Sequence, residues 1–147
     1  MEQSAVISTL NSLIEACQDG HAGYQVAAHG VTNMEIKRAL GQIARERRQF
    51  EEELRAHIEQ LGGKPRERGT VVGALHRGWM QLKEQFGHPT PANMLHECSR
   101  GESACVRTYN EALGKELPAE VKGIVSVQLG RINAARERLT ELGRQGE

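Results

Sequence analysis

Two segments of the chain combine glycine, a side chain that can bind a metal or carry a proton, and a tyrosine. Residues 101–113 read GESACVRTYNEAL, and residues 20–28 read GHAGYQVAA. In each segment a glycine precedes Glu102 or His21, and a tyrosine follows among small residues. Carboxylate and imidazole groups are metal ligands and proton carriers. The repeated pattern predicts one face of a long helix, used once in each half of the molecule.

Further polar side chains fall on or beside the apolar stripes of the expected helices when positions are plotted at 100° per residue. Glu102 and Arg131 lie at similar distances from the turn at Pro118, so we expect these two side chains to pair. We also expect a buried polar layer halfway along the molecule. Its members are Arg47, Glu51, Glu102, Gln128 and Arg131.

In one class of four-helix bundle, a layer at this level holds a di-iron or di-manganese site. Such a site takes a Glu from each of two helices and a Glu-x-x-His from each of the other two. This sequence contains no Glu-x-x-His. Core-facing Arg47 and Arg131 would repel metal ions and would instead pair with carboxylates. We therefore favour a salt-bridged layer without a cofactor.

Two metal-binding alternatives remain open. The first is an iron or manganese site, and its candidate ligands are Glu102, His21, Glu51 and Glu15. The second is a soft-metal site formed by Cys17 and His21, four residues apart on one helix, with Cys105. An unsupported cysteine on a helical stripe is more often a small core residue.

The periodicity of apolar residues predicts the elements that position these side chains. Helices are expected at about 3–29, 33–61, 71–86, 91–117 and 119–142. Gly30 is expected to end the first helix, and a capping box of Thr32 and Glu35 to start the second. Thr90 before Pro91 predicts another helix start.

Short loops within each pair of long helices require antiparallel hairpins, and the connector KPRERG with the short helix forms a crossover between them. We expect an all-α, ferritin-like antiparallel four-helix bundle in a single domain spanning residues 1–147.

Composition excludes several classes of protein. The formal net charge of the 147 residues is zero, whereas nucleic-acid binders usually carry a basic surplus. No apolar run approaches the length of a membrane span. The first residues, MEQSAVISTL, lack the basic and apolar regions of an export signal, so we expect a cytoplasmic protein. Three cysteines do not suggest a disulfide framework.

Four segments together resemble a bacterial family of ferritin-like four-helix-bundle proteins of unknown function. They are LNSLIEACQDGHAGYQVAA, RRQFEEEL, GALHRGW and GESACVRTYNEALGKELPAEV. The resemblance spans about residues 10–142 and implies the bundle fold, a cytoplasmic bacterial setting and a stress-related role. It implies no established activity. In the family pattern an acidic residue is common at the position of His21, and a His is common near Arg136.

These observations predict a non-enzymatic structural or interaction protein of bacterial stress physiology that associates with itself as a dimer. The alternative is a metal-binding redox or storage protein of the di-iron or di-manganese type. A third interpretation, a subunit that lends an apolar hairpin to a partner, requires a contiguous exposed patch of Leu, Met and Trp side chains.

Overall fold

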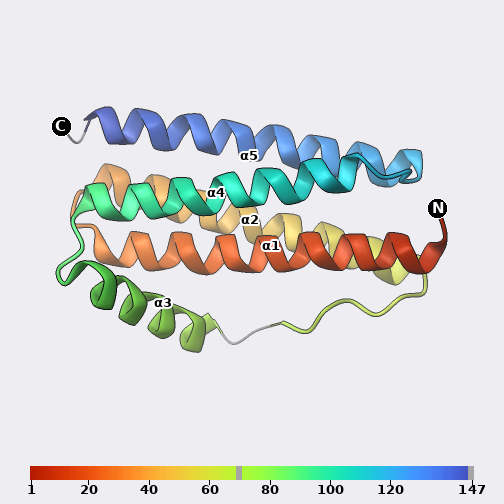
Figure 1. The fold of residues 1–147 in the computed structure, drawn as a ribbon, viewed down its shortest axis with the longest axis horizontal. Helices are drawn as coiled ribbons and strands as arrows, with labels where there is room; N and C mark the ends of the chain where they lie inside the picture. The colour runs from red at the N-terminus through yellow and green to blue at the C-terminus, as the bar shows by residue number, and fades with distance from the viewer. Residues whose placement is uncertain (69–70, 146–147) are drawn as a thin grey trace.

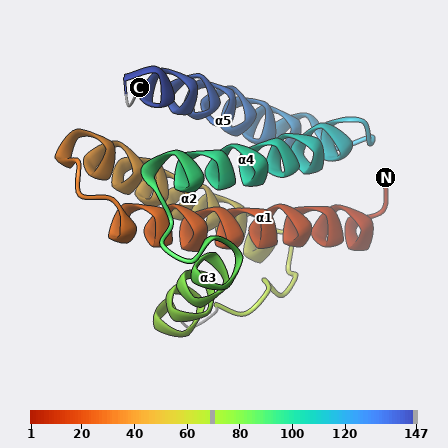
Figure 2. The ribbon, with the colours of Figure 1, turned by 60° about the vertical axis from the view of Figure 1, so that its left-hand side comes forward.

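In the computed structural model, residues 1–68 and 71–145 are described, and for residues 71–76 the description covers the backbone alone. These residues form five helices and no strand. The helices are α1 (Gln3–Gly30), α2 (Met34–Gln60), α3 (Val71–Phe86), α4 (Pro91–Leu113) and α5 (Ala119–Gln145). The four long helices lie side by side, and α3 lies outside them against α1 (Figure 1). The view in Figure 2 also places α3 on the far side of α1 from α5.

The connections make two antiparallel hairpins, α1 with α2 and α4 with α5, joined by a crossover that contains α3 (Figure 1). The prediction of an all-α bundle with this connectivity is confirmed. None of the described helices is long and apolar enough to cross a membrane.

The helix starts follow local hydrogen bonding. Thr90 accepts a bond from the Asn93 backbone N–H at 3.1 Å, and the Asn93 side chain accepts one from Thr90 N–H at 3.0 Å. The second helix starts differently from the prediction, because its cap is Asn33 rather than Thr32. The Asn33 side chain accepts a bond from Ile36 N–H at 3.1 Å, which satisfies a donor of the first turn.

The helix ends also differ from the prediction, most clearly in α4 and α5. Helix α4 ends at Leu113 and not at residue 117, since the chain turns at Gly114, whose N–H bonds back to Asn110 at 3.0 Å. Leu117 is buried in this turn before Pro118, which disfavours helical backbone in the residue ahead of it. Helix α5 continues three residues beyond 142, to Gln145.

Gly30 lies inside the last turn of α1 instead of after it, and its role is close packing. A Cβ atom at Gly30 would lie 2.5 Å from the Met94 sulfur and 2.6 Å from a ring carbon of Trp79. The Trp79 ring also meets the His29 ring edge-on, with centroids 6.1 Å apart. The missing side chain therefore lets α3 and α4 approach the end of α1. Of the GALHRGW segment, the side chains up to His76 lie outside the described residues.

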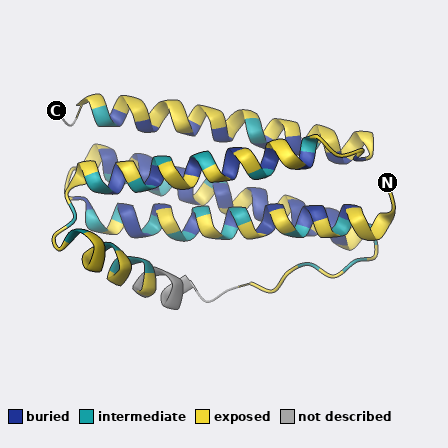
Figure 3. Cartoon of the chain, in the orientation of Figure 1, coloured by how far each residue is buried: buried dark blue, intermediate teal, exposed yellow. Residues whose placement is uncertain are grey.

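The buried faces of the four long helices form the core (Figure 3). One apolar cluster surrounds Leu13, Leu54 and Ile132, and a second surrounds Leu40, Met94 and Leu139. Both clusters draw on α1, α2, α4 and α5. A polar layer lies within this apolar frame.

Candidate functional site

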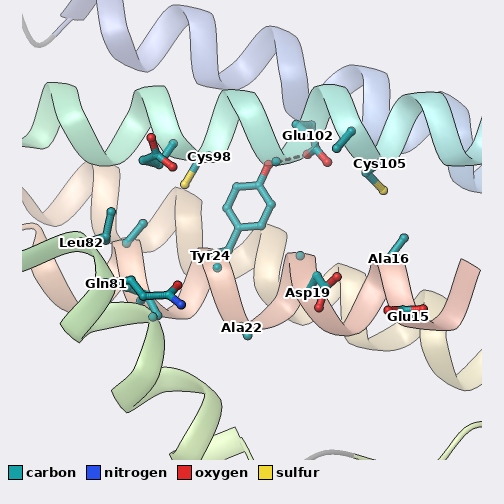
Figure 4. Close-up of a pocket in the computed structure, with 18 of the residues that line it drawn as sticks. Glu15, Ala16, Asp19, Ala22, Tyr24, Gln81, Leu82, Cys98, Glu102 and Cys105 are labelled. Carbon is teal, nitrogen blue, oxygen red and sulfur yellow. Dashed lines mark hydrogen bonds between the residues drawn. The ribbon is translucent and has the colours of Figure 1, made fainter. Parts of the chain in front are cut away.

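The polar layer contains a bidentate ion pair between α2 and α4. The two terminal nitrogens of Arg47, Nη1 and Nη2, donate to Glu102 Oε1 and Oε2, each at 2.8 Å. Both residues are only 1% exposed. The Tyr24 hydroxyl of α1 donates a further bond to Glu102 Oε2 (Figure 4). Groups from two other helices therefore engage both oxygens of the carboxylate.

The electrostatics of this cluster favour a charged pair beside a neutral phenol. Burial alone would lower the pKa of Arg47, but the hydrogen bonds and the charge of Glu102 outweigh it and raise that pKa. Burial raises the pKa of Tyr24, and the neighbouring Glu102 charge raises it further. The guanidinium also lies over the rings of Tyr24 and Phe50, at 5.5 and 6.0 Å from their centroids.

Gly20 creates the space that Arg47 occupies. A Cβ atom at Gly20 would lie 2.9 Å from Arg47 Nη1 and 3.2 Å from Arg47 Cγ. A glycine inside this helix predicts close approach of a neighbouring helix or a bulky ring, and the group that approaches Gly20 is the Arg47 side chain. The bare backbone of α1 allows a long α2 side chain to extend toward α4.

A second buried network lies beside the ion pair and links all four long helices. The Cys17 sulfur lies 3.2 Å from the Tyr109 hydroxyl, which donates to Gln128 Oε1 at 2.7 Å. The Gln128 amide then donates to the Phe50 carbonyl at 3.3 Å and to Glu53 at 3.2 Å. Because Tyr109 donates its proton to Gln128, the Cys17 thiol must be the donor to Tyr109. Each group in the network therefore donates to the next one, from Cys17 through Tyr109 to Gln128.

His21 does not face Glu102, although it is buried as its place on the stripe suggests. Its Nδ1 lies 2.9 Å from the Ala44 carbonyl, which can only accept, so Nδ1 carries the proton. No described group lies within hydrogen-bond distance of His21 Nε2. The imidazole thus joins α1 to the α2 backbone.

Glu51 is buried but serves the crossover instead of the ion pair. It accepts a bond from Arg55 Nε at 2.8 Å, and Arg55 Nη1 donates to the Arg66 carbonyl of the crossover. Gln18 bridges Glu51 and the Glu67 carbonyl, at 3.4 and 3.0 Å. The pair of Glu51 and Arg55 therefore fixes the crossover to the first hairpin.

Two expected members of the site lie at the surface. The Arg131 side chain is 62% exposed and pairs with Glu46 at 3.1 Å, so the expected pair with Glu102 is wrong. Arg47 occupies that place from α2 instead. The Glu15 side chain is 53% exposed and lies 3.5 Å from Arg66.

The expected polar layer did not include Arg55 or the two tyrosines of the opening segments, Tyr24 and Tyr109. A signal existed for each of them. A tyrosine on an apolar stripe needs a partner for its hydroxyl when buried, and Arg55 follows Glu51 by four residues on the same helix face.

Comparison with known proteins identifies the family. The family model described as "Domain of unknown function (DUF2383)" matches residues 5–115. The chain belongs to this family. A search among curated proteins found no match.

Two solved structures share the fold of this DUF2383 protein. A mutant of Dps1 from Mycobacterium smegmatis has a TM-score of 0.79 and 14% identity, over 96% of each chain. The bacterioferritin-related protein of Bacteroides fragilis, described as a dodecameric thioferritin, has a TM-score of 0.75 and 17% identity. That match covers 99% of this chain and 90% of the other. The predictions of a ferritin-like fold and a family of unknown function are confirmed.

The residues of this DUF2383 chain do not fit a di-metal centre. Of the four carboxylate and imidazole candidates, Glu102 binds Arg47, Glu51 binds Arg55, His21 binds a backbone carbonyl and Glu15 is exposed. In the described part of the chain, no three His, Cys, Asp or Glu side chains gather closely enough to hold a metal ion. The Cys17, His21 and Cys105 set is likewise divided among separate partners, since Cys105 accepts a weak bond from Arg47 at 3.7 Å.

An open groove runs along the outside of this layer, between α1 and α4, with α3 over one end (Figure 4). Its volume is about 840 Å³. Tyr24 crosses from α1 toward Glu102 in the middle of the groove, and Cys98 and Cys105 point into it from α4 (Figure 4). Tyr24 and Glu102 line the groove, so the ion pair lies directly behind its inner wall.

The three cysteines are buried and unpaired, and their thiols are poor nucleophiles. Burial raises the pKa of Cys17 and of Cys98 to about 12, and that of Cys105 to about 11. We expect all three thiols of the native protein to react with Ellman's reagent at pH 8 far more slowly than in urea-unfolded protein. Fast labelling of Cys98 or Cys105 through the groove would contradict this.

Proposed function

We propose that this DUF2383 protein is a metal-independent ferritin-like bundle that acts as a non-enzymatic structural or interaction protein. One observation carries the proposal. A guanidinium, Arg47, fills the place beside Glu102 in the polar layer, and both carboxylate oxygens are engaged by it.

The buried Glu102 carboxylate has its counter-charge within the protein. A buried carboxylate needs a positive partner, which is either a metal ion or a cationic side chain. Arg47 supplies that charge permanently, because its pKa is raised further by Glu102. A metal ion near Glu102 would have to displace the guanidinium, and the described residues offer no group of three His, Cys, Asp or Glu side chains that could hold the ion.

The proposal includes self-association, with a dimer as its unit, in a bacterial cytoplasm and in a stress-related setting. The Bacteroides fragilis protein of the same fold is described as dodecameric, which supports a homo-oligomer. The resemblance of the GALHRGW and GESACVRTYNEAL segments to a bacterial family supports the setting. Light scattering coupled to size exclusion measures the subunit number directly, and a monomer at all concentrations would contradict this part.

Metal analysis tests the main proposal. We expect tag-free protein, grown with added iron, manganese or zinc, to contain no stoichiometric metal. Its melting temperature should not change with Mn²⁺, Zn²⁺ or anaerobic Fe²⁺. A ligand present at 100 times its Kd would stabilise the fold by about 2.7 kcal/mol, which is several degrees for a chain of this size.

Two variants, one at Glu102 and one at an exposed control position, test whether any bound metal is held by the polar layer. Two metals per chain that are lost in Glu102→Ala, but kept in the exposed control Glu141→Ala, would overturn the proposal. That result would establish the iron or manganese alternative.

A further inference from the structure

The groove between α1 and α4 is long enough to hold an extended ligand. Its α1 wall runs from Ser12 to Ala27, which is about 22 Å at the helical rise of 1.5 Å per residue. The volume of about 840 Å³ lies in the range of small-molecule sites. An extended ligand fits this shape better than a compact one.

Glycine and other small residues line the groove where a ligand would lie. A Cβ atom at Gly23 on α1 or at Gly101 on α4 would meet no atom within 4 Å. Ala16 and Ala104 also line the groove. These positions leave open space over apolar walls, to which methylene groups can pack.

The rims of the groove carry an excess of negative charge. Apart from Glu102, which Arg47 neutralises, the described lining contains Glu15, Asp19, Glu97 and Glu111 against the single cation Arg77. Among the described residues, Glu15 and Glu97 pair only with exposed arginines, over long distances of 3.5 and 3.8 Å.

Asp19 and Glu111 are two carboxylates of the lining that a bound cation could pair with. Neither has an ion-pair partner among the described residues. Burial raises the pKa of Asp19 and repulsion from Glu15 raises it further, while the charge of Arg66 only partly opposes them, so a cation beside Asp19 would stabilise its charged form.

We propose that this groove binds an elongated organic cation of the linear aliphatic polyamine class. Its methylene segments pack along the small side chains of α1 and α4, and its ammonium groups pair with the carboxylates of the rims. An anion is disfavoured, because Arg77 is the only cationic side chain in the described lining. The inference goes beyond the proposed function, because it uses the carboxylates at the rims and leaves the ion pair of Arg47 and Glu102 in place, although Glu102 also lines the groove.

Calorimetric titration with spermine, at low ionic strength, tests the proposal. We expect saturable binding to the full-length protein. The double variant Gly23→Leu/Gly101→Leu should weaken it by about tenfold or more, because leucine fills the groove. Leucine is a better helix former than glycine, so this variant should fold. The variant Asp19→Asn/Glu111→Gln should weaken binding by a similar factor.

Matched controls separate the groove from general effects. Gly123→Leu/Gly130→Leu introduces the same side chains at two open positions of α5 and should bind spermine as the wild type does. Glu137→Gln/Glu141→Gln removes two exposed charges of α5 with the same expectation. Absence of saturable binding, or equal weakening by the α5 variants, would overturn the proposal. So would equally tight binding of hexaamminecobalt(III), a compact trivalent cation without methylene segments.

Discussion

Replacement of Arg47 with methionine is expected to lower the free energy of unfolding by about 3–5 kcal/mol, because it leaves the buried Glu102 carboxylate without its counter-charge. The side chains of both partners are at most 1% exposed, so the carboxylate loses its counter-charge in a poorly hydrated site. Urea unfolding monitored by circular dichroism gives the measurement.

The control for this prediction lies one residue away. Arg48 is exposed on the same helix, and Arg48→Met should change the free energy of unfolding by no more than about 0.5 kcal/mol. The double variant Arg47→Met/Glu102→Gln should be more stable than Arg47→Met alone, since it removes the uncompensated charge while keeping an acceptor for Tyr24. If the losses from the two single variants simply add, Arg47 and Glu102 do not act as a pair.

Alkaline pH is expected to unfold the protein steeply, because its thiols must stay neutral in the folded state. An unfolded thiol ionises near pH 9, whereas the pKa of Cys17 and Cys98 is raised to about 12 and that of Cys105 to about 11. A group with a raised folded pKa stabilises the protein fully below its unfolded pKa. That stability is lost as the pH rises toward the folded pKa.

The loss should amount to about 1.4 kcal/mol per pH unit for each thiol above pH 9. Urea unfolding at a series of pH values from 8 to 11 measures this slope. The triple variant Cys17→Ala/Cys98→Ala/Cys105→Ala should show a shallower slope, even if it is less stable at pH 8. An unchanged slope would mean that the thiols do not contribute, and that Tyr24 and Tyr109, whose pKa values burial also raises, account for the effect.

The helices and their order follow from the sequence because apolar periodicity is a local property. The spacing of apolar residues predicts five helices, and the short loops within each pair require two hairpins. The cap of α2 did not follow from the sequence, because Thr32 and Asn33 are adjacent residues of types that can both cap a helix. Only the backbone path selects Asn33. The end of α4 was missed for a similar reason, because Leu117 continues the apolar pattern into a turn.

The sequence by itself determined that Arg47, Glu51, Glu102 and Gln128 face the interior of the bundle, although it also placed Arg131 there, whose side chain is 62% exposed. It did not determine which of them meet. A helical plot gives a direction about one axis, but not the rotation and axial offset of the neighbouring helix.

Only the tertiary structure decided that Arg47 and not Arg131 pairs with Glu102, and that Glu51 holds the crossover. The physical reason is space and distance across the bundle. Gly20 leaves room for the Arg47 side chain to reach α4, whereas Arg131 extends to Glu46 at the surface.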